Sequence, residues 1–273
     1  DIYWRVWRKA FLKEFKNLKQ KYEADFCIAC VDNLSSWRWA IEKHAVELEK
    51  AWVDLMTSWD HFFDNISKIR DYLNLENPKM IRPANYYDTE FYKIPGVGYK
   101  VLEKDGKKVL FVHLLSGSCM RDMVYNPFLK LQEIIDLHKD ENIKNIIVDF
   151  HREFTAEIYW MAFCFDWKIS FVYWTHTHLQ TNDEMILDNG TWVIWDVWMS
   201  WSQFSVIWAT LESVQKRFFS GLNKWKIEQS LDERYVVNGI FVETDDNTWK
   251  TISLEKIRIN SKLSELGLDK TSI

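Results

Sequence analysis

The sequence predicts an α/β fold in which strands alternate with covering helices. Patterns with helical spacing of apolar residues lead repeatedly into short, continuous apolar runs, as in sheets packed against helices. Asp, Asn or His follows several of these runs at once, and four of the seven histidines fall there. Because ligands of α/β sheets collect beyond the carboxyl ends of the strands, these positions are the first candidates for a functional site.

The first 82 residues contain three helix and strand pairs. Apolar residues at helical spacing in 11–22 lead to the apolar run from Asp25 to Val31. Helices around 41–51 and 66–73 lead to strands around 53–57 and 79–82. Each run is short and rich in apolar residues, which indicates a buried strand.

The middle of the chain is predicted to form a hairpin, after which helices and strands alternate again. Two strands over 98–115 surround Asp105-Gly106, a hairpin turn signal. A helix over 127–137 precedes a strand over 145–150, and another helix precedes a strand over 168–173. The tail, about 226–259, is predicted to form antiparallel strands with turns at Asn238-Gly239 and at 245–247. Since no repeat or Pro/Ser-rich linker occurs, we expect one domain over 1–273, with a peripheral tail from about residue 260.

Composition excludes several classes of function. The chain has 273 residues, with 35 Lys and Arg against 40 Asp and Glu, and this net charge of -5 disfavours a nucleic-acid or membrane-surface binder. No apolar run approaches the roughly 18 residues of a membrane span, and no signal peptide is visible at Asp1, so we expect a cytoplasmic protein. No Gly-rich phosphate loop is present.

The four cysteines do not indicate a disulfide scaffold or a metal site. The closest pair, Cys27 and Cys30, lies in a predicted buried strand, where residues three apart point to opposite faces. We therefore expect these cysteines to serve packing.

The polar residues after the strands form a candidate metal centre. They are Asp32 and Asn33 after the first run, Asp60 and His61 after the second, His151, and then His176 and His178, with Asp1 preceding the first helix. Carboxylates, imidazoles and an amide are ligands of first-row transition metals, and so many groups suit two ions roughly 3.5–4 Å apart. Taken singly, Asp32 or Asp60 has an alternative role as a helix N-cap, and His151 as a hydrogen-bonded histidine at a strand end.

An ordered set of motifs resembles the YmdB-like branch of the calcineurin-type metallophosphoesterases. The motifs cover nearly the whole chain and lie at 1–8, 31–33, 58–61, 81–86, 148–151, 175–181 and 196–200. The resemblance implies a four-layer α-β-β-α sandwich with a dinuclear centre, Fe or Mn being the expected metals. It also implies hydrolysis of phosphodiesters such as 2′,3′-cyclic or 3′,5′-cyclic nucleotides.

The resemblance also implies a role for each candidate residue. Asp1, Asn33 and His178 would bind one metal ion. Asp60, His151 and His176 would bind the other, Asp32 would bridge both ions, and His61 would protonate the leaving oxygen after attack by a metal-activated hydroxide. Weaker candidates are Arg82 and Asn85 for contact with phosphate or ribose, or for a structural role in the turn, and Asp196 for orienting a metal-bound histidine.

The chain departs from the family pattern at its acidic ligands and at its start. The family carries Glu in place of Asp32 and Asn in place of Asp60, so the bridging arm is shorter and the site gains a negative charge. The strand expected before Asp1 is missing, so the sequence resembles an N-terminally truncated member.

The third departure concerns tryptophan. The chain has only 8 Gly but 16 Trp. Trp stands where the family has, or readily accepts, Gly at positions 4, 7, 37, 39, 52, 59, 174, 198, 201 and 208. An indole at a tight turn strains the backbone or overpacks the site. We hypothesise that many of these residues come from UGA codons that the organism reads as glycine; the alternative is a genuinely aromatic-rich variant.

The sequence thus favours a metal-dependent phosphodiesterase acting on a small-molecule substrate. A phosphomonoesterase or phosphoprotein phosphatase is the alternative within enzymes, because the same two-metal centre cleaves both kinds of ester. A catalytically impaired regulatory protein with the same fold is the alternative outside them, given the residues at 32 and 60. No membrane or sequence-specific nucleic-acid partner is expected, and homo-oligomerisation is left open.

Overall fold

The computed structural model of the chain describes residues 2, 4–35, 40–59, 61, 63–118, 122–197 and 199–267, with the side chains of 4–6 excepted. Strands form three sheets. The first is parallel, with β1 (Ile28–Cys30), β2 (Leu55–Thr57) and β3 (Met80–Ile81) in that order. The second is antiparallel, with β10 (Trp201–Ser202), β11 (Arg234–Thr244) and β12 (Thr251–Lys262).

The third and largest sheet has six strands in the order β4-β5-β6-β7-β9-β8. These are β4 (Tyr99–Lys104), β5 (Lys107–Leu115), β6 (Asn145–His151), β7 (Phe171–Tyr173), β8 (Met185–Ile186) and β9 (Trp192–Ile194). The central strands β5, β6, β7 and β9 are parallel, and the edge strands β4 and β8 pair antiparallel. The carboxyl ends of the central strands therefore meet at one edge.

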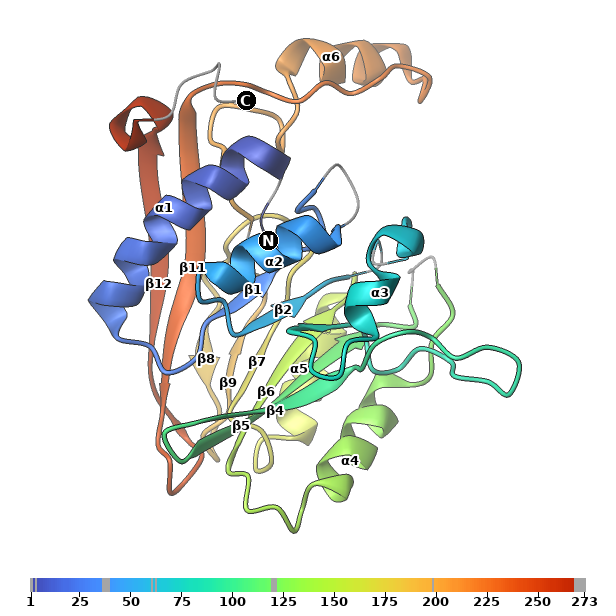
Figure 1. Cartoon of the computed structure of the whole chain (residues 1–273), viewed down its shortest axis with the longest axis vertical. Helices are drawn as coiled ribbons and strands as arrows, with labels where there is room; N and C mark the ends of the chain where they lie inside the picture. Colours follow the sequence, from blue (N-terminus) through green and yellow to red (C-terminus); the bar gives the residue numbers. More distant parts are fainter. Residues whose placement is uncertain are drawn as a thin grey trace.

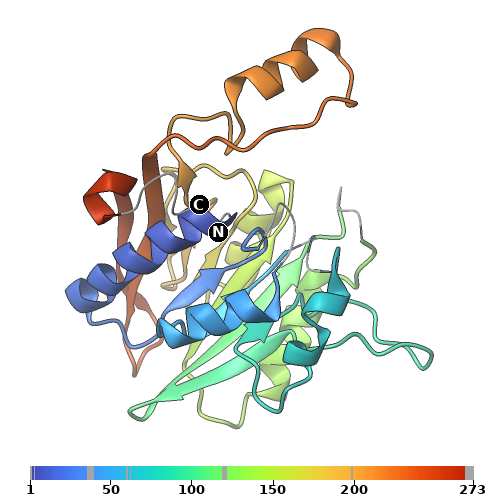
Figure 2. The same ribbon diagram turned by 45° about the horizontal axis from the view of Figure 1, so that its top comes forward.

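Helices cover the outer faces of the sheets (Figures 1 and 2). On one side lie α1 (Trp4–Tyr22), α2 (Glu42–Lys50), the 3-10 turn η1 (Ile66–Lys68) and α3 (Arg70–Leu73). Against the six-stranded sheet lie α4 (Pro127–Leu137) and α5 (Thr155–Cys164). The remaining elements are α6 (Leu211–Ser220), which stands away from the rest of the molecule, and the 3-10 turn η2 (Leu263–Leu266).

Three apolar clusters separate these layers. One joins α1, α2 and α3 to the strands beneath them, and another joins α4 and α5 to the six-stranded sheet. The third lies between the sheets and brings Leu55 and Ile81 against Phe111 and Phe171. The order is helices, sheet, sheet, helices, and the predicted α/β fold is confirmed. In the described part of the chain, no helix is both long and apolar enough to cross a membrane.

Most predicted elements are present, with two corrections. The predicted helix over 66–73 is divided into η1 and α3. The predicted turn at Asn238-Gly239 is wrong, because both residues lie inside β11 and pair with Arg258 and Ile257 of β12. Asn238 instead donates from its side chain to the Met199 carbonyl, 2.9 Å away, so a tertiary contact overrides the local turn preference.

The start of the chain lies between the two small sheets. The backbone N–H of Ile2 donates to the Cys30 carbonyl at 3.1 Å, and Ile2 forms a parallel bridge with Ser200. Ile2 is buried and belongs to the cluster beneath α1. These contacts place Ile2 beside both β1 and the segment that leads into β10.

A buried histidine connects the sheets below the strand ends. His113 of β5 is fully buried, and its Nε2 donates to the carbonyl of Ser58, which follows β2. Its Nδ1 lies 3.1 Å from the Asp149 carbonyl and 3.8 Å from the Asp149 carboxylate. Asp149 in turn accepts from the Thr175 hydroxyl at 3.3 Å. His113 therefore ties the segment after β2 to β6 and, through Asp149, to the segment after β7.

We predict that His113→Ala lowers the free energy of unfolding by at least about 2 kcal/mol, because each buried group left without a partner costs about 1–3 kcal/mol. His113→Gln should lose less, since its amide retains a donor that can reach one carbonyl. Urea denaturation followed by tryptophan fluorescence measures both. Equal stability of the alanine variant and the parent chain would show that the contacts of His113 contribute nothing to the free energy of unfolding.

Candidate metal centre

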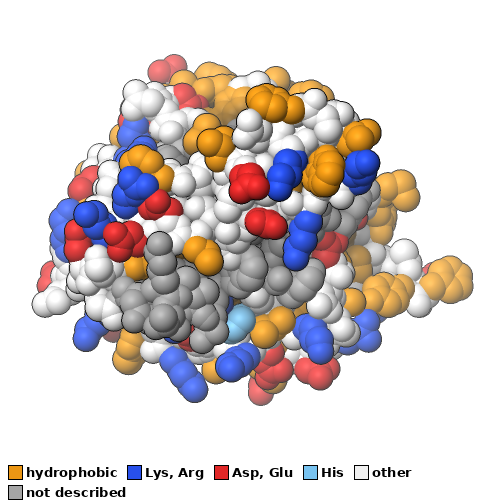
Figure 3. All heavy atoms as spheres, turned by 90° about the horizontal axis from the view of Figure 1, so that it is seen from above, with side chains coloured by type: hydrophobic (Ala, Val, Ile, Leu, Met, Phe, Trp, Pro, Cys, Tyr) orange, Lys and Arg blue, Asp and Glu red, His pale blue; other side chains and the backbone are white. Residues whose placement is uncertain are grey.

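The candidate residues gather where β1, β2, β6 and β7 end. Asp32 and Asn33 follow β1, and His61 comes shortly after β2. His151 is the last residue of β6, and the segment with His176 and His178 follows β7. Figure 3 looks onto the molecule from above and shows a histidine side chain at the surface.

His151 is held in an orientation suited to binding a metal ion. It is fully buried, and its Nδ1 donates to the Thr175 carbonyl. Burial, and then the nearby His176, hold the pKa of His151 well below its usual value, so the ring is neutral. Its lone pair is therefore on Nε2, which lies 3.2 Å from Nδ1 of His176. Metal-binding histidines commonly donate their second ring nitrogen to a backbone carbonyl in this way.

His176 faces an acidic residue and is fixed by another. Its Nε2 lies 2.5 Å from the carboxylate of Glu153, two residues after His151. The Asp196 carboxylate accepts from the backbone N–H of His176 at 2.9 Å and of Thr177 at 2.7 Å, and from the Thr177 hydroxyl at 2.8 Å. Asp196 thus shapes the turn that carries the histidines.

His178 lies in the same buried region. Burial, followed by the neighbouring His176, lowers the pKa of His178 to about 3, so this ring is also neutral near pH 7. Its φ of 61° is in the left-handed region, which histidine adopts more readily than most residues. The ring packs between the indoles of Trp59 and Trp201, with centroids 6.0 and 5.8 Å away.

Asp32 and His61 approach this cluster from the other sheet. Asp32 is buried, and its Oδ1 accepts from the backbone N–H of Trp59 at 2.8 Å, which joins the segments after β1 and β2. His61 is partly exposed, and its Nδ1 lies 3.2 Å from the Asp64 carboxylate. His61 is also near enough to contribute to the lowered pKa of His178. Asn33 is buried beside Asp32.

Two indoles fill space next to these rings. Trp59 is only 3% exposed and stacks on His151 with centroids 4.6 Å apart. Trp174 stacks on His176 with centroids 5.7 Å apart, and the guanidinium of Arg152 lies over the same indole, 4.1 Å from its centroid. The site therefore has aromatic walls around its histidines.

The donors described here fit a transition metal in type, although their set is incomplete. Asp1 and Asp60, two of the predicted ligands, lie outside the described residues. Within the described ranges, no three His, Cys, Asp or Glu side chains are arranged to hold one ion. The neutral ring of His151 with one nitrogen fixed by a carbonyl, the neutral ring of His178 and the buried carboxylate of Asp32 are nevertheless donor types that such ions select.

Arg82 and Asn85 make structural contacts. The Arg82 guanidinium donates to the Pro83 carbonyl at 2.9 Å and to Asp88 at 3.2 Å. The Asn85 side chain is fully buried and bonds to the backbone of Leu115 and Tyr125. Their predicted contact with substrate stays a prediction.

Sequence reasoning did not single out three residues that the structure places beside the histidines. Glu153 contacts His176, Thr175 accepts from His151, and His113 supports the segment after β2. For Glu153 there was a signal, its spacing of two residues from His151. The roles of the other two depend on backbone and cross-sheet contacts that sequence does not reveal.

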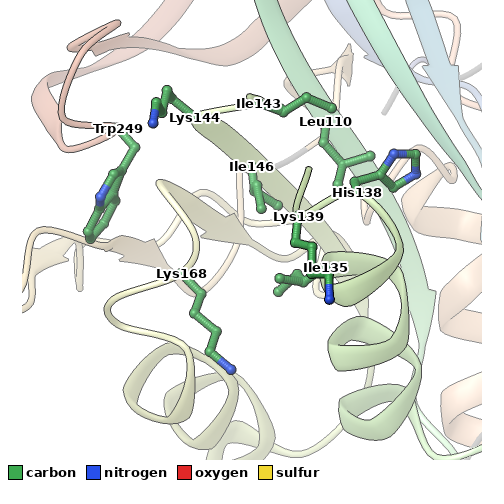
Figure 4. A pocket seen from close by; sticks show the side chains of 9 residues that line it. All are labelled: Leu110, Ile135, His138, Lys139, Ile143, Lys144, Ile146, Lys168 and Trp249. Atoms are coloured by element: carbon green, nitrogen blue, oxygen red, sulfur yellow. The ribbon is translucent and has the colours of Figure 1, made fainter. Parts of the chain in front are cut away.

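A separate pocket of about 190 Å³ lies at the opposite, amino end of β6 (Figure 4). It is lined by Leu110, Ile135, His138, Lys139, Ile143, Lys144, Ile146, Lys168 and Trp249. None of the predicted metal ligands contributes to it. This pocket is therefore distinct from the histidine cluster.

Comparison with known proteins identifies relatives along almost the whole chain. It is 30% identical over 251 residues to a 2′,3′-cyclic-nucleotide 2′-phosphodiesterase of Bacillus subtilis, covering 91% of each chain. The crystal structure of a novel phosphatase from Mycoplasma pneumoniae matches with a TM-score of 0.85 and 30% identity, over 99% of this chain and 95% of the other. A hypothetical protein from Thermus thermophilus shares the fold, with a TM-score of 0.83, 23% identity and coverage of 95% and 96%.

A family profile gives the same assignment. The profile described as YmdB-like protein matches residues 1–257. The match spans every candidate ligand and all the strands described above except the last residues of β12. The chain therefore belongs to the YmdB-like protein family and is a hydrolase of phosphate esters.

Proposed function

We propose that this chain is a metal-dependent phosphodiesterase that hydrolyses small cyclic nucleotides with a two-metal centre at the strand ends. The observation that carries the proposal is the arrangement of His151, whose Nδ1 is bound by the Thr175 carbonyl while Nε2 faces His176. The name of the Bacillus subtilis relative supports the substrate class, because 2′,3′-cyclic nucleotides are diesters.

The proposed metal ligands come from both sheets. Asp1, Asn33 and His178 would hold one ion, Asp60, His151 and His176 the other, and Asp32 would bridge them. Iron or manganese is the metal that we expect, since mixed imidazole and carboxylate sets suit them. When bound, such ions lower the pKa of a water molecule and neutralise charge on the phosphoryl oxygens.

The protein's own groups orient these ligands and supply a proton. Thr175 fixes the ring of His151, and Asp196 fixes the backbone of His176 and Thr177. His61 is partly exposed, and its Nδ1 lies 3.2 Å from the Asp64 carboxylate, which can orient the imidazole. His61 is therefore the group that we assign to protonate the leaving oxygen.

The charge of the site bears on its choice of substrate. Asp32 and Asp60 replace a longer carboxylate and a neutral amide of the family pattern. With Asp1 the site then has three carboxylates, one negative charge more than the family pattern, which weakens the attraction for a phosphate that two divalent ions provide. A diester, with one negative charge at its phosphate, is less affected than a monoester with nearly two. This favours diesterase activity over phosphomonoesterase activity.

We predict that His151→Ala lowers both the metal content per chain and the turnover of bis-p-nitrophenyl phosphate, because it removes one ligand and the ring held by Thr175. Elemental analysis after loading with Mn or Fe measures the first effect. His138→Ala is the matched control, since His138 lies at the end of α4 and lines the other pocket. Unchanged metal content in His151→Ala would contradict the ligand assignment.

His61→Ala should lower turnover by roughly 10²- to 10⁴-fold, the usual contribution of a positioned proton donor. Its metal content should stay close to that of the parent chain, because His61 is assigned no ligand role. The measurement is kcat with a diester whose leaving group is poor, where protonation matters most. Full activity of this variant would remove His61 from the mechanism.

Paired substrates separate the alternatives. Supplied with Mn or Fe, the enzyme should hydrolyse bis-p-nitrophenyl phosphate and 2′,3′-cyclic AMP faster than p-nitrophenyl phosphate. Faster cleavage of the monoester would instead assign a phosphomonoesterase. Metal binding without turnover of either substrate would support a regulatory role.

A further inference from the structure

Three turns of the chain place tryptophan where the backbone requires the left-handed conformation. Trp52, Trp208 and Trp249 have φ values of 73°, 72° and 61°. In this region the Cβ of an ordinary residue meets the neighbouring carbonyl, a penalty that glycine does not have. In each of the three turns, the position that tryptophan occupies is one that favours glycine.

Trp52 ends helix α2. Its N–H bonds to the Glu49 carbonyl at 2.9 Å, and the N–H of Val53 bonds to the Leu48 carbonyl at 3.1 Å. This pair of bonds defines the Schellman motif, in which the left-handed residue is usually glycine. Elsewhere in the chain, Gly221 after α6 and Gly267 after η2 end their helices with φ of 66° and 64°. Trp52 is 69% exposed, so no burial of its ring compensates for the strained backbone.

Trp208 occupies a two-residue hairpin turn. Val206 and Ala209 exchange N–H to carbonyl bonds of 2.9 and 3.1 Å around Ile207 and Trp208. Both central residues have positive φ, 48° and 72°, which is the type I′ turn. Its second central position is most often glycine, as in Asn-Gly.

Trp249 closes the loop between β11 and β12. Its N–H bonds to the Asp245 carbonyl at 2.9 Å, and the N–H of Asp245 bonds to the Lys250 carbonyl at 2.9 Å. The side chain of Asp245 caps the start of the loop by accepting from Asn247 and Thr248. A left-handed residue then returns the chain to the strand, a place that again favours glycine.

Tryptophan occurs among the residues with positive φ far more often than its share of the sequence predicts. Among the described residues other than glycine, eight have positive φ, and three of these are Trp. Trp is 16 of the 273 residues, so chance would place about none or one there. Asp, Asn and His, which tolerate this conformation, account for three of the other five.

Buried indoles give a second, independent observation. The indole N–H groups of Trp7, Trp59, Trp174 and Trp192 are buried and have no hydrogen-bond partner in the described part of the chain. Buried tryptophans ordinarily satisfy this donor, because leaving it unpaired is unfavourable. Backbone geometry and donor pairing therefore both show tryptophans in surroundings that do not suit them.

We infer that positions 52, 208 and 249 are glycine in the protein made by its own cell, and that their printed tryptophans stand for a codon which that cell reads as glycine. UGA is the codon concerned, because a translation that reads UGA as Trp prints tryptophan wherever a cell that assigns UGA to Gly inserts glycine. The same codon at 59 and 174 would remove the two indoles that stack on His151 and His176. The inference concerns the covalent chain and does not depend on the proposed activity.

The coding DNA and the native protein test the inference directly. We expect UGA at codons 52, 59, 174, 208 and 249, and glycine in the corresponding peptides by mass spectrometry of protein from the source cells. UGG at 52, 208 and 249, or tryptophan in those peptides, would overturn it. Neither readout requires the recombinant chain to fold or to be active.

A stability comparison tests the backbone argument. Trp52→Gly should lower the unfolding equilibrium constant roughly five- to thirtyfold, whereas Trp52→Ala, which removes the indole but keeps Cβ, should gain much less. Trp160→Gly is the matched control of opposite sign, because Trp160 is half-exposed within α5, where glycine weakens the helix. If Trp52→Gly and Trp52→Ala have equal effects, the left-handed backbone is not the reason for glycine at 52.

Discussion

The parallel pairing of strands is the constraint on which the site depends. β1 runs parallel to β2, and β6 runs parallel to β7. Trp59, after β2, stacks on His151 at the end of β6, so the four strands end at the same place in the molecule. The apolar layer between the sheets holds the two edges against each other, and His113 and Asp149 add polar contacts just below them. Asp32 on one sheet is thereby joined, through its hydrogen bond to Trp59, to a ring that stacks on His151 of the other, although these residues are far apart in sequence.

Much of this arrangement could be predicted from sequence because its signals are local. Apolar runs mark the strands, and Asp32, His151 and His176 stand directly at or after them. The supporting contacts were not predictable in the same way, since the Thr175 carbonyl and the His113 ring act across elements that only folding brings together. The wrong turn at Asn238-Gly239 has the same cause: a pair with strong turn preference extends β11 because Asn238 bonds to the segment before β10.

Tryptophan shows where composition and geometry complement each other. The counts of Gly and Trp raise a question about the whole chain, but they do not say which positions are affected. Backbone conformation does, and it adds Trp249, which resemblance to the family did not mark. It also separates turns, where the Cβ itself is unfavourable, from the histidine cluster, where the difficulty is the volume of the ring. Alanine in one of the turns would keep the unfavourable Cβ, whereas alanine at 59 or 174 would remove the ring volume beside the histidines.

The segment that carries α6 begins and ends at one place. The N–H of Thr210 bonds to the Glu228 carbonyl at 2.8 Å, and Ala209 forms an antiparallel bridge with Gln229, while the helix stands away from the sheets (Figure 2). Because both ends meet, the chain leaves and re-enters the layered body at one point. Evolution or a protein engineer can therefore lengthen, shorten or exchange this excursion for another module while the layered body keeps its connectivity.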